Sequence, residues 1–159
     1  MIISPESLAV LGGAIALAGG LAGSAIGIAR AGVNGIATLA EEPGQLRNVI
    51  VLASLPMTQT FYGLIIFILV VTSVLPKFAT MADVGGSGFA VFACGLIAAF
   101  AELWSGAYQG SVCASGISLL PKTKGQILTN SMMLAVFVEL IGVLGLVFTI
   151  MAFTMLGLM

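Results

Sequence analysis

The sequence has very few charged residues and no histidine. Charged residues make up 7% of its 159 residues, whereas soluble globular domains carry about 25%. The formal net charge is −1 and there is no basic tract, which argues against binding to nucleic acid. Without histidine, the usual zinc sites and catalytic triads lack their commonest component.

Cysteine is also scarce. Cys94 and Cys113 lie in apolar, helix-like sequence. If they share one helix, their spacing of 19 residues separates them by roughly 28 Å. That distance excludes a disulfide within this helix, and we interpret both cysteines as small buried hydrophobic residues.

Long hydrophobic runs are what the sequence has in abundance. Hydrophobic residues make up 60% of the chain, and crossing a bilayer takes about 20 apolar residues. Four stretches are long enough, at 7–30, 49–75, 88–119 and 127–157. The breaks between them contain proline or glycine with charged residues, as turns do, at 40–48, 76–88 and 121–126. The sequence therefore predicts an all-α membrane protein with four transmembrane helices.

The two halves of the sequence repeat each other with a shift of 81 residues. This shift aligns Ser24 with Ser105 and the loop pair Gly44-Gln45 with Gly125-Gln126. We therefore predict two tandem helical hairpins in the same orientation, at 1–78 and 79–159, that form one structural unit.

Basic residues predict how the hairpins lie in the cell membrane. Four of them flank the loops inside the hairpins (Arg30, Arg47, Lys122 and Lys124), whereas Lys77 lies on the other side. Because lysine and arginine favour the cytoplasmic side, we expect the loops at 40–48 and 121–126 to be cytoplasmic and both termini to lie outside.

A ladder of small residues follows the first helix at every fourth position, at Gly19, Gly23, Gly27, Ala31 and Gly35. Such a ladder lets helices approach closely, either within the chain or along the inner wall of an oligomer, which is the interpretation we favour. The repeat aligns its glycines with an aromatic ridge (Phe100, Trp104 and Tyr108), and we expect ridge and groove to interlock between the third and first helices.

One glutamate, Glu139, lies in the middle of the apolar run "MMLAVFVELIGVLGLVFTIM". An ionised side chain at mid-bilayer costs about 2.5–3.5 kcal/mol on insertion scales, so we expect a function for it. Thr58, Gln59, Gln109 and Glu139 lie 12 to 15 residues from the cytoplasmic loops. Three helices thus bring polar groups to one depth, roughly 18–22 Å from those loops.

The second helix shows this pattern in detail. Leu55, Thr58, Gln59 and Tyr62 share one face, and Pro56 loosens backbone carbonyls close to it. The resulting set of oxygens with one negative charge suits a hard monovalent cation. Two glutamines and a threonine are more than a proton requires, so we favour Na⁺ over H⁺. A hydrogen-bonded knot around a neutral Glu139 is a structural alternative.

Glu102 is the second carboxylate within an apolar run. It precedes Gln109 by seven residues and so lies on about the same helix face, roughly 10 Å nearer the outer surface. The sequence leaves open whether it lies on the route of an ion, is paired, or faces the interior of an assembly.

Three motifs, "LPMTQTFYG", "SGAYQGSVCASGI" and "VFVELIGVLG", together with the duplicated hairpins resemble the proteolipid of V-type ATPases. The resemblance is closest to the K (c-type) subunit of bacterial sodium-translocating enzymes. It implies that the Na⁺ ligands are Glu139, Gln109, Gln59, Thr58 and the Leu55 carbonyl, with Tyr62 hydrogen-bonded to Glu139. Glu102 lies outside the pattern.

The resemblance also implies an assembly. Copies of the chain would form a rotor ring in lipid, next to a stator membrane subunit and a central-stalk subunit that contacts the cytoplasmic loops. The chain itself would perform no catalytic chemistry. The same ring coupled to H⁺ is one alternative, and a small four-helix cation-coupled exporter is another.

Overall fold

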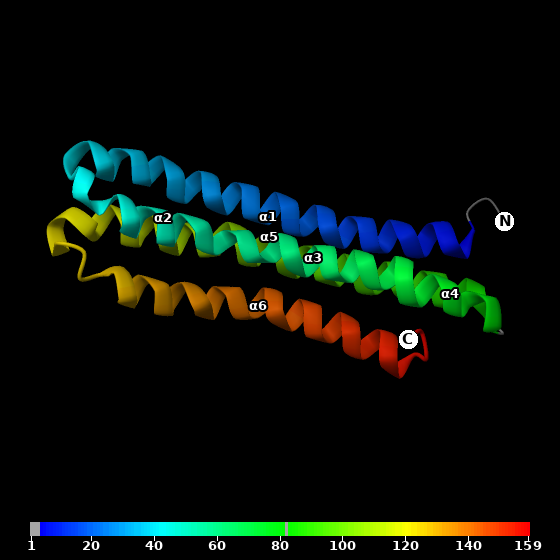
Figure 1. The fold of residues 1–159 in the computed structure, drawn as a ribbon. Helices are drawn as coiled ribbons and strands as arrows, with labels where there is room; N and C mark the ends of the chain where they lie inside the picture. The colour runs from blue at the N-terminus through cyan, green and yellow to red at the C-terminus, as the bar shows by residue number, and fades with distance from the viewer. Residues whose placement is uncertain (1–3, 82) are drawn as a thin grey trace.

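The computed structural model describes residues 4–81 and 83–159, and within these residues it contains helices and no strands. The described residues form four long helical spans, which lie side by side, with the start of the first span and the C-terminus at the same end (Figure 1). Each span is long and apolar enough to cross a membrane, namely Pro5–Glu41, Pro43–Thr80, Val84–Thr123 and Leu128–Met155. The predicted four-helix membrane fold is therefore confirmed.

Three of the spans are continuous helices, α1 (Pro5–Glu41), α5 (Val84–Thr123) and α6 (Leu128–Met155). Helix α1 begins where Ser4 Oγ accepts the Ser7 N–H at 3.2 Å and Pro5 occupies the first turn. At 37 residues, α1 is about 55 Å long, and a hydrocarbon core is about 30 Å thick. The helices therefore extend beyond the bilayer.

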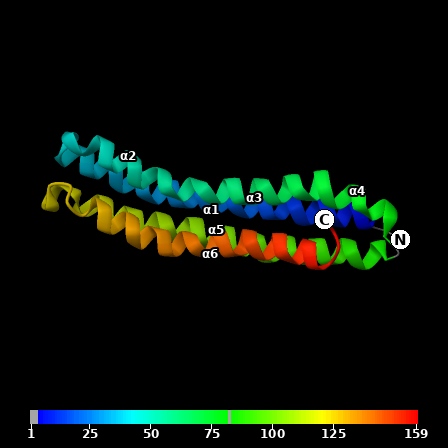
Figure 2. The same cartoon turned by 60° about the horizontal axis from the view of Figure 1, so that its bottom comes forward.

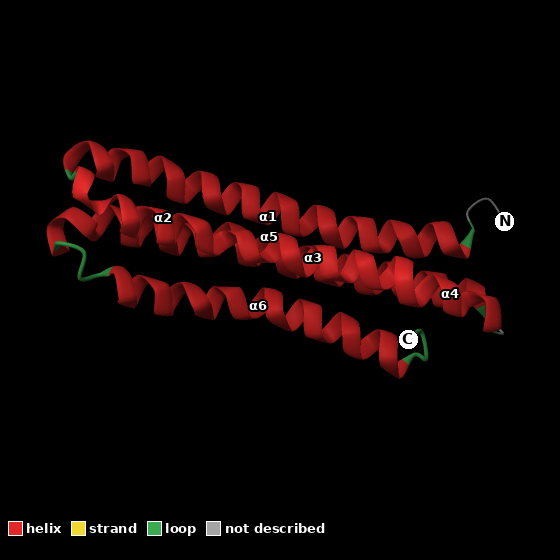
Figure 3. Cartoon of the chain, in the orientation of Figure 1, coloured by secondary structure: helices red, strands yellow, loops and turns green. Residues whose placement is uncertain are grey.

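The second span changes helix type several times. It runs through short 3₁₀ segments at Pro43–Gln45, Leu55–Met57 and Phe78–Thr80, a π-helical segment at Val70–Val74, and the α-helices α2 (Leu46–Ser54), α3 (Thr58–Leu69) and α4 (Leu75–Lys77). Figure 3 shows that these segments follow one another as one rod. Prolines at 43, 56 and 76 begin three of them, because proline removes a backbone donor.

Two of the expected loops are shorter than the sequence predicted. The segment 40–48 is mostly helical, because α1 continues to Glu41 and Glu42 alone breaks the helix before Pro43 starts the next turn. The segment 76–88 is also largely helical, since α4 and its 3₁₀ continuation reach Thr80 and α5 starts at Val84.

The turn of the second hairpin lies where it was expected. Pro121 is inside the last turns of α5, and the chain then reverses through Lys124 and Gly125, with φ of 51° and 82°. The Gly125 N–H donates to the Leu120 carbonyl at 3.0 Å and closes the helix end. Gly125 suits this position because a side chain is strained at positive φ.

Helices α1 and α5 make the most extensive contact between two helices in the described residues and lie next to each other in Figure 2. A Cβ atom added to Gly19 would lie 2.6 Å from Ala99 Cα, and one added to Gly23 would lie 2.6 Å from the Glu102 carbonyl oxygen. The glycine ladder of α1 therefore packs against the backbone of α5 within the chain, as small residues allow.

The aromatic ridge does not fill this groove. Phe100, Trp104 and Tyr108 are 60%, 51% and 54% exposed, and the Trp104 and Tyr108 rings stack on each other at 5.7 Å. The expected interlock of ridge and groove is therefore wrong within one chain, because the small residues of α5 occupy the groove instead.

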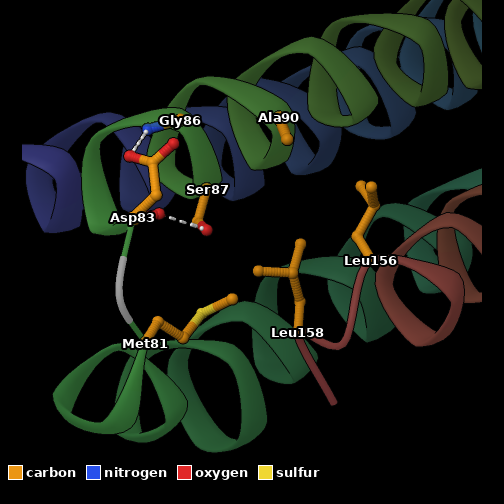
Figure 4. Close-up of a pocket in the computed structure, with 7 residues that line it drawn as sticks. All are labelled: Met81, Asp83, Gly86, Ser87, Ala90, Leu156 and Leu158. Atoms are coloured by element: carbon orange, nitrogen blue, oxygen red, sulfur yellow. Dashed lines mark hydrogen bonds between the residues drawn. The ribbon is translucent and has the colours of Figure 1, made fainter.

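The end of the bundle opposite the Lys124 turn carries a shallow cavity of about 270 Å³ between the start of α5 and the C-terminal turn (Figure 4). Asp83 caps α5, with Oδ1 accepting the Gly86 N–H at 2.9 Å. Ser87 Oγ donates to the Asp83 carbonyl at 2.8 Å. Apolar side chains of Met81, Leu156 and Leu158 complete the lining.

Candidate ion-binding site

The site starts from the interruption of the second span at Pro56. The 3₁₀ turn Leu55–Met57 places the Leu55 carbonyl where it accepts both the backbone N–H and the hydroxyl of Thr58, the latter at 3.3 Å. Two residues further on, the Thr60 N–H donates to Ser24 Oγ of α1 at 3.2 Å. Pro56 thus interrupts the regular α-helical hydrogen bonding of the backbone at the depth where the polar side chains lie.

Glu139 is half-buried on α6, and both of its carboxylate oxygens accept hydrogen bonds from neutral donors. Tyr62 Oη of α3 donates to Oε1 at 2.9 Å, and Gln109 Nε2 of α5 donates to Oε2 at 3.1 Å. Three helices therefore meet at this carboxylate. Hydrogen bonds to a charged acceptor are stronger than neutral ones, so the carboxylate is held in a defined position.

Two buried amides extend the network away from Glu139. Gln59 and Gln109 are both fully buried, and Gln59 Nε2 donates to Gln109 Oε1 at 2.9 Å. The other side of the Gln59 amide, Oε1, accepts from the Thr58 hydroxyl at 3.3 Å. All six residues named from the sequence, Leu55, Thr58, Gln59, Tyr62, Gln109 and Glu139, are thus linked by hydrogen bonds.

Ser105 belongs to the network, although the sequence analysis did not assign it to the site. Its hydroxyl accepts from Gln59 Nε2 at 3.0 Å and donates to the Val138 carbonyl of α6 at 2.9 Å. It therefore joins the second span to α6 one residue before Glu139. The internal repeat could have indicated this role, because it aligns Ser105 with Ser24. Ser24 also accepts a hydrogen bond from the second span.

The network is suited to one hard monovalent cation. It gathers carboxylate, amide, hydroxyl and carbonyl oxygens with a single negative charge, and such ligands prefer hard cations. The described part of the chain contains no group of three or more His, Cys, Asp or Glu side chains of the kind that holds a metal ion. The free-energy cost of placing a carboxylate at the edge of the apolar helix bundle is much lower when one bound cation neutralises its charge.

Glu102 lies outside this network. It is fully buried on α5, and neither carboxyl oxygen has a hydrogen-bond partner within the described residues. The cysteines of the same helix, Cys94 and Cys113, are buried and free.

Comparison with known proteins places the chain in a family. The family model that describes the C subunit of ATP synthase matches residues 11–70 and again residues 92–152. The two matches begin 81 positions apart, which is the shift of the internal repeat.

Two curated proteins are similar over most of the chain. The A-type ATP synthase subunit K of Methanocaldococcus jannaschii is 31% identical over 94% of this chain, which spans 63% of that protein's length. The V-type sodium ATPase subunit K of Enterococcus hirae is 34% identical over 79% of this chain and 76% of that protein. The chain belongs to the family of the ATP synthase C subunit.

Proposed function

We propose that each copy of this chain binds one Na⁺ at Glu139 and carries it past a stator during ATP-driven rotation of the ring. The observation that carries the proposal is the meeting of Tyr62, Gln109 and Glu139, which come from three helices, at 2.9 and 3.1 Å. The name of the Enterococcus hirae relative, a sodium ATPase subunit, supports the choice of ion.

The ligands of the proposed Na⁺ are oxygens already gathered at one depth. Glu139 supplies the charge, the amide oxygens of Gln59 and Gln109 and the hydroxyl of Thr58 supply dipoles, and the Leu55 carbonyl completes the set. Gln59 Oε1 and Thr58 Oγ1 lie 3.3 Å apart, and small rotations of their side chains turn both oxygens toward a cation. Tyr62 holds Glu139 without being a ligand.

The alternation between loaded and empty states couples rotation to transport. A loaded site is nearly neutral and can face lipid, whereas an empty carboxylate must meet water or a cation of the stator. The ring therefore turns freely only when its sites in the lipid are loaded. By the distribution of basic residues, the turns near Glu42 and Lys124 lie in the cytoplasm, where they meet a central-stalk subunit, and both termini lie outside.

Carbodiimide labelling of Glu139 in the purified ring tests the proposal. Carbodiimides modify protonated carboxyls in apolar surroundings, so bound Na⁺ should slow the modification near neutral pH, and K⁺ at equal ionic strength should not. Protection by raised pH alone would mean that the ring carries protons. No modification under any condition would mean that Glu139 has a structural role.

Transport gives the second readout. In vesicles that contain the whole complex, Glu139→Gln should abolish ATP-driven Na⁺ uptake while the ring still assembles, because glutamine keeps the shape of the side chain and loses its charge. Undiminished uptake would refute the proposal.

A further inference from the structure

The function proposed above leaves one buried ionisable group unused. Glu102 is 0% exposed, and both of its carboxyl oxygens are without a hydrogen-bond partner within the described residues. Buried polar groups are almost always hydrogen-bonded, and an unpaired buried charge is strongly destabilising. The carboxyl of Glu102 must therefore be neutralised by a bound cation or a proton.

Helix α6 leaves room for this carboxyl. A Cβ atom added to Gly142 would lie 2.7 Å from Glu102 Oε2, and one added to Gly145 would lie 3.7 Å from Oε1. The Gly142 position is also 3.1 Å from Ser105 Oγ by the same construction. The carboxyl of Glu102 and the hydroxyl of Ser105 thus share one recess, which two glycines keep open.

The oxygens around the recess decide which cation fits. Ser105 Oγ already accepts from Gln59 and donates to the Val138 carbonyl, and a hydroxyl has two lone pairs and one hydrogen. One lone pair is therefore left for Glu102. A metal cation needs several oxygens in place of its hydration shell, whereas a proton on the carboxyl needs a single acceptor.

We propose that Glu102 is a second cation position of this chain, that it holds a proton, and that this proton is separate from the Na⁺ at Glu139. The carboxylic acid donates its hydrogen to the free lone pair of Ser105 after a small rotation of the Glu102 side chain. The protonation of Glu102 depends on its own surroundings and not on which ion Glu139 carries, whereas the positioning role given next rests on the proposed function.

The bound proton sets the direction of the hydrogen bonds that lead to the Na⁺ site. With a donor at Glu102, Ser105 keeps its own hydrogen on the Val138 carbonyl and accepts the Gln59 Nε2 hydrogen. That leaves Gln59 Oε1 turned toward Thr58 and the cation. An ionised Glu102 would instead compete for the Ser105 hydrogen and disturb this orientation. Glu102 is therefore a positioning residue for Gln59.

Infrared spectroscopy of the complete ring in lipid tests the protonation directly. With saturating Na⁺ near neutral pH, the wild-type ring should show the C=O band of one carboxylic acid per chain. The band should be lost in Glu102→Gln and kept in Glu139→Gln. If Glu102→Gln does not assemble, Glu139→Gln alone still tests the protonation, because Glu102 is the buried glutamate that this variant keeps. Absence of the band from both the wild type and Glu139→Gln would overturn the proposal. Two bound Na⁺ per chain would also overturn it, because Na⁺ and not a proton would then neutralise Glu102.

A pair of variants tests the positioning role. Glu102→Gln keeps a neutral donor for Ser105, whereas Glu102→Met fills the same space without one. The Na⁺ concentration that half-protects Glu139 from carbodiimide should be about five-fold higher in Glu102→Met than in Glu102→Gln, as expected for one neutral hydrogen bond. Equal concentrations in the two variants would overturn the positioning role.

Discussion

Under the proposed function, replacing Gln59 by methionine should separate Na⁺ binding from proton binding at Glu139. The amide of Gln59 contacts Thr58, Ser105 and Gln109 and makes no hydrogen bond to Glu139. Methionine is unbranched and of similar length, so it fills the fully buried position while it removes the amide oxygen. A proton on Glu139 needs the carboxylate and its own donors, which the variant keeps, whereas Na⁺ loses one ligand.

The expected magnitude follows from the interactions that differ between the loaded and empty site. A polar contact to a charged group contributes about 1.5–3 kcal/mol, which corresponds to Na⁺ binding that is about 10- to 150-fold weaker. The variant also leaves Ser105 Oγ and Gln109 Oε1 without the donor that Gln59 Nε2 provides. That cost lowers stability in both states and so largely cancels from the affinity.

The assay is the rate of carbodiimide modification of Glu139 in intact rings, measured against Na⁺ at constant ionic strength and against pH without Na⁺. In Gln59→Met the Na⁺ midpoint should rise and the pH midpoint should stay within a few-fold of wild type. Thr60→Val is the matched control, because the neighbouring Thr60 hydroxyl contacts the Gly20 carbonyl at 3.4 Å and lies outside the network. A Na⁺ midpoint that stays at the wild-type value, or that moves equally in Thr60→Val, would refute the reasoning.

Four further substitutions have definite expected outcomes. Tyr62→Phe removes the 2.9 Å donor to Glu139 and should speed release of radioactive Na⁺ from loaded rings by about 10-fold or more; an unchanged rate would mean that Tyr62 does not hold the loaded site. Gly23→Ala places a methyl 2.6 Å from a backbone oxygen of α5 and should destabilise the chain by about 1–3 kcal/mol. Ring recovery and thermal dissociation measure this loss. The control Gly32→Ala adds a methyl that meets nothing within 4 Å and should behave as wild type. Gly125→Ala, at φ 82°, should cost about 1–2 kcal/mol in the same thermal measurement without changing Na⁺ protection of Glu139.

The arrangement of the site in depth was predictable because a helix has a fixed rise per residue. Counting from the turns placed Thr58, Gln59, Gln109 and Glu139 at one level before any contact was known. The structure joins Gln59 to Gln109 and Gln109 to Glu139 by direct hydrogen bonds. Depth and helix face are properties of one helix at a time, so a single sequence carries them.

Contacts between helices were harder to predict. A ladder of small residues can pack against many surfaces, and the sequence did not show that α5 fills the groove and leaves Trp104 exposed. Ser105 was missed for the same reason, because its role depends on the Val138 carbonyl of a neighbouring helix. The segments 40–48 and 76–88 are more helical than the sequence predicts, because Pro43 fits the first turn of a new helical segment and α4 continues as a 3₁₀ turn to Thr80.

Under the proposed function, the duplication accounts for a single transporting carboxylate in a chain of four helices. The internal repeat aligns Thr58 with Glu139, so the first hairpin has a hydroxyl where the second has the acid. The first hairpin nevertheless contributes to the site, because Gln59 and Tyr62 bond to residues of the second. A second carboxylate at position 58 would place two like charges in one network. Under the proposed function, one ion for every four helices means fewer ions per turn of the ring, so each ion receives more of the free energy of ATP hydrolysis and the gradient that the pump can sustain is steeper.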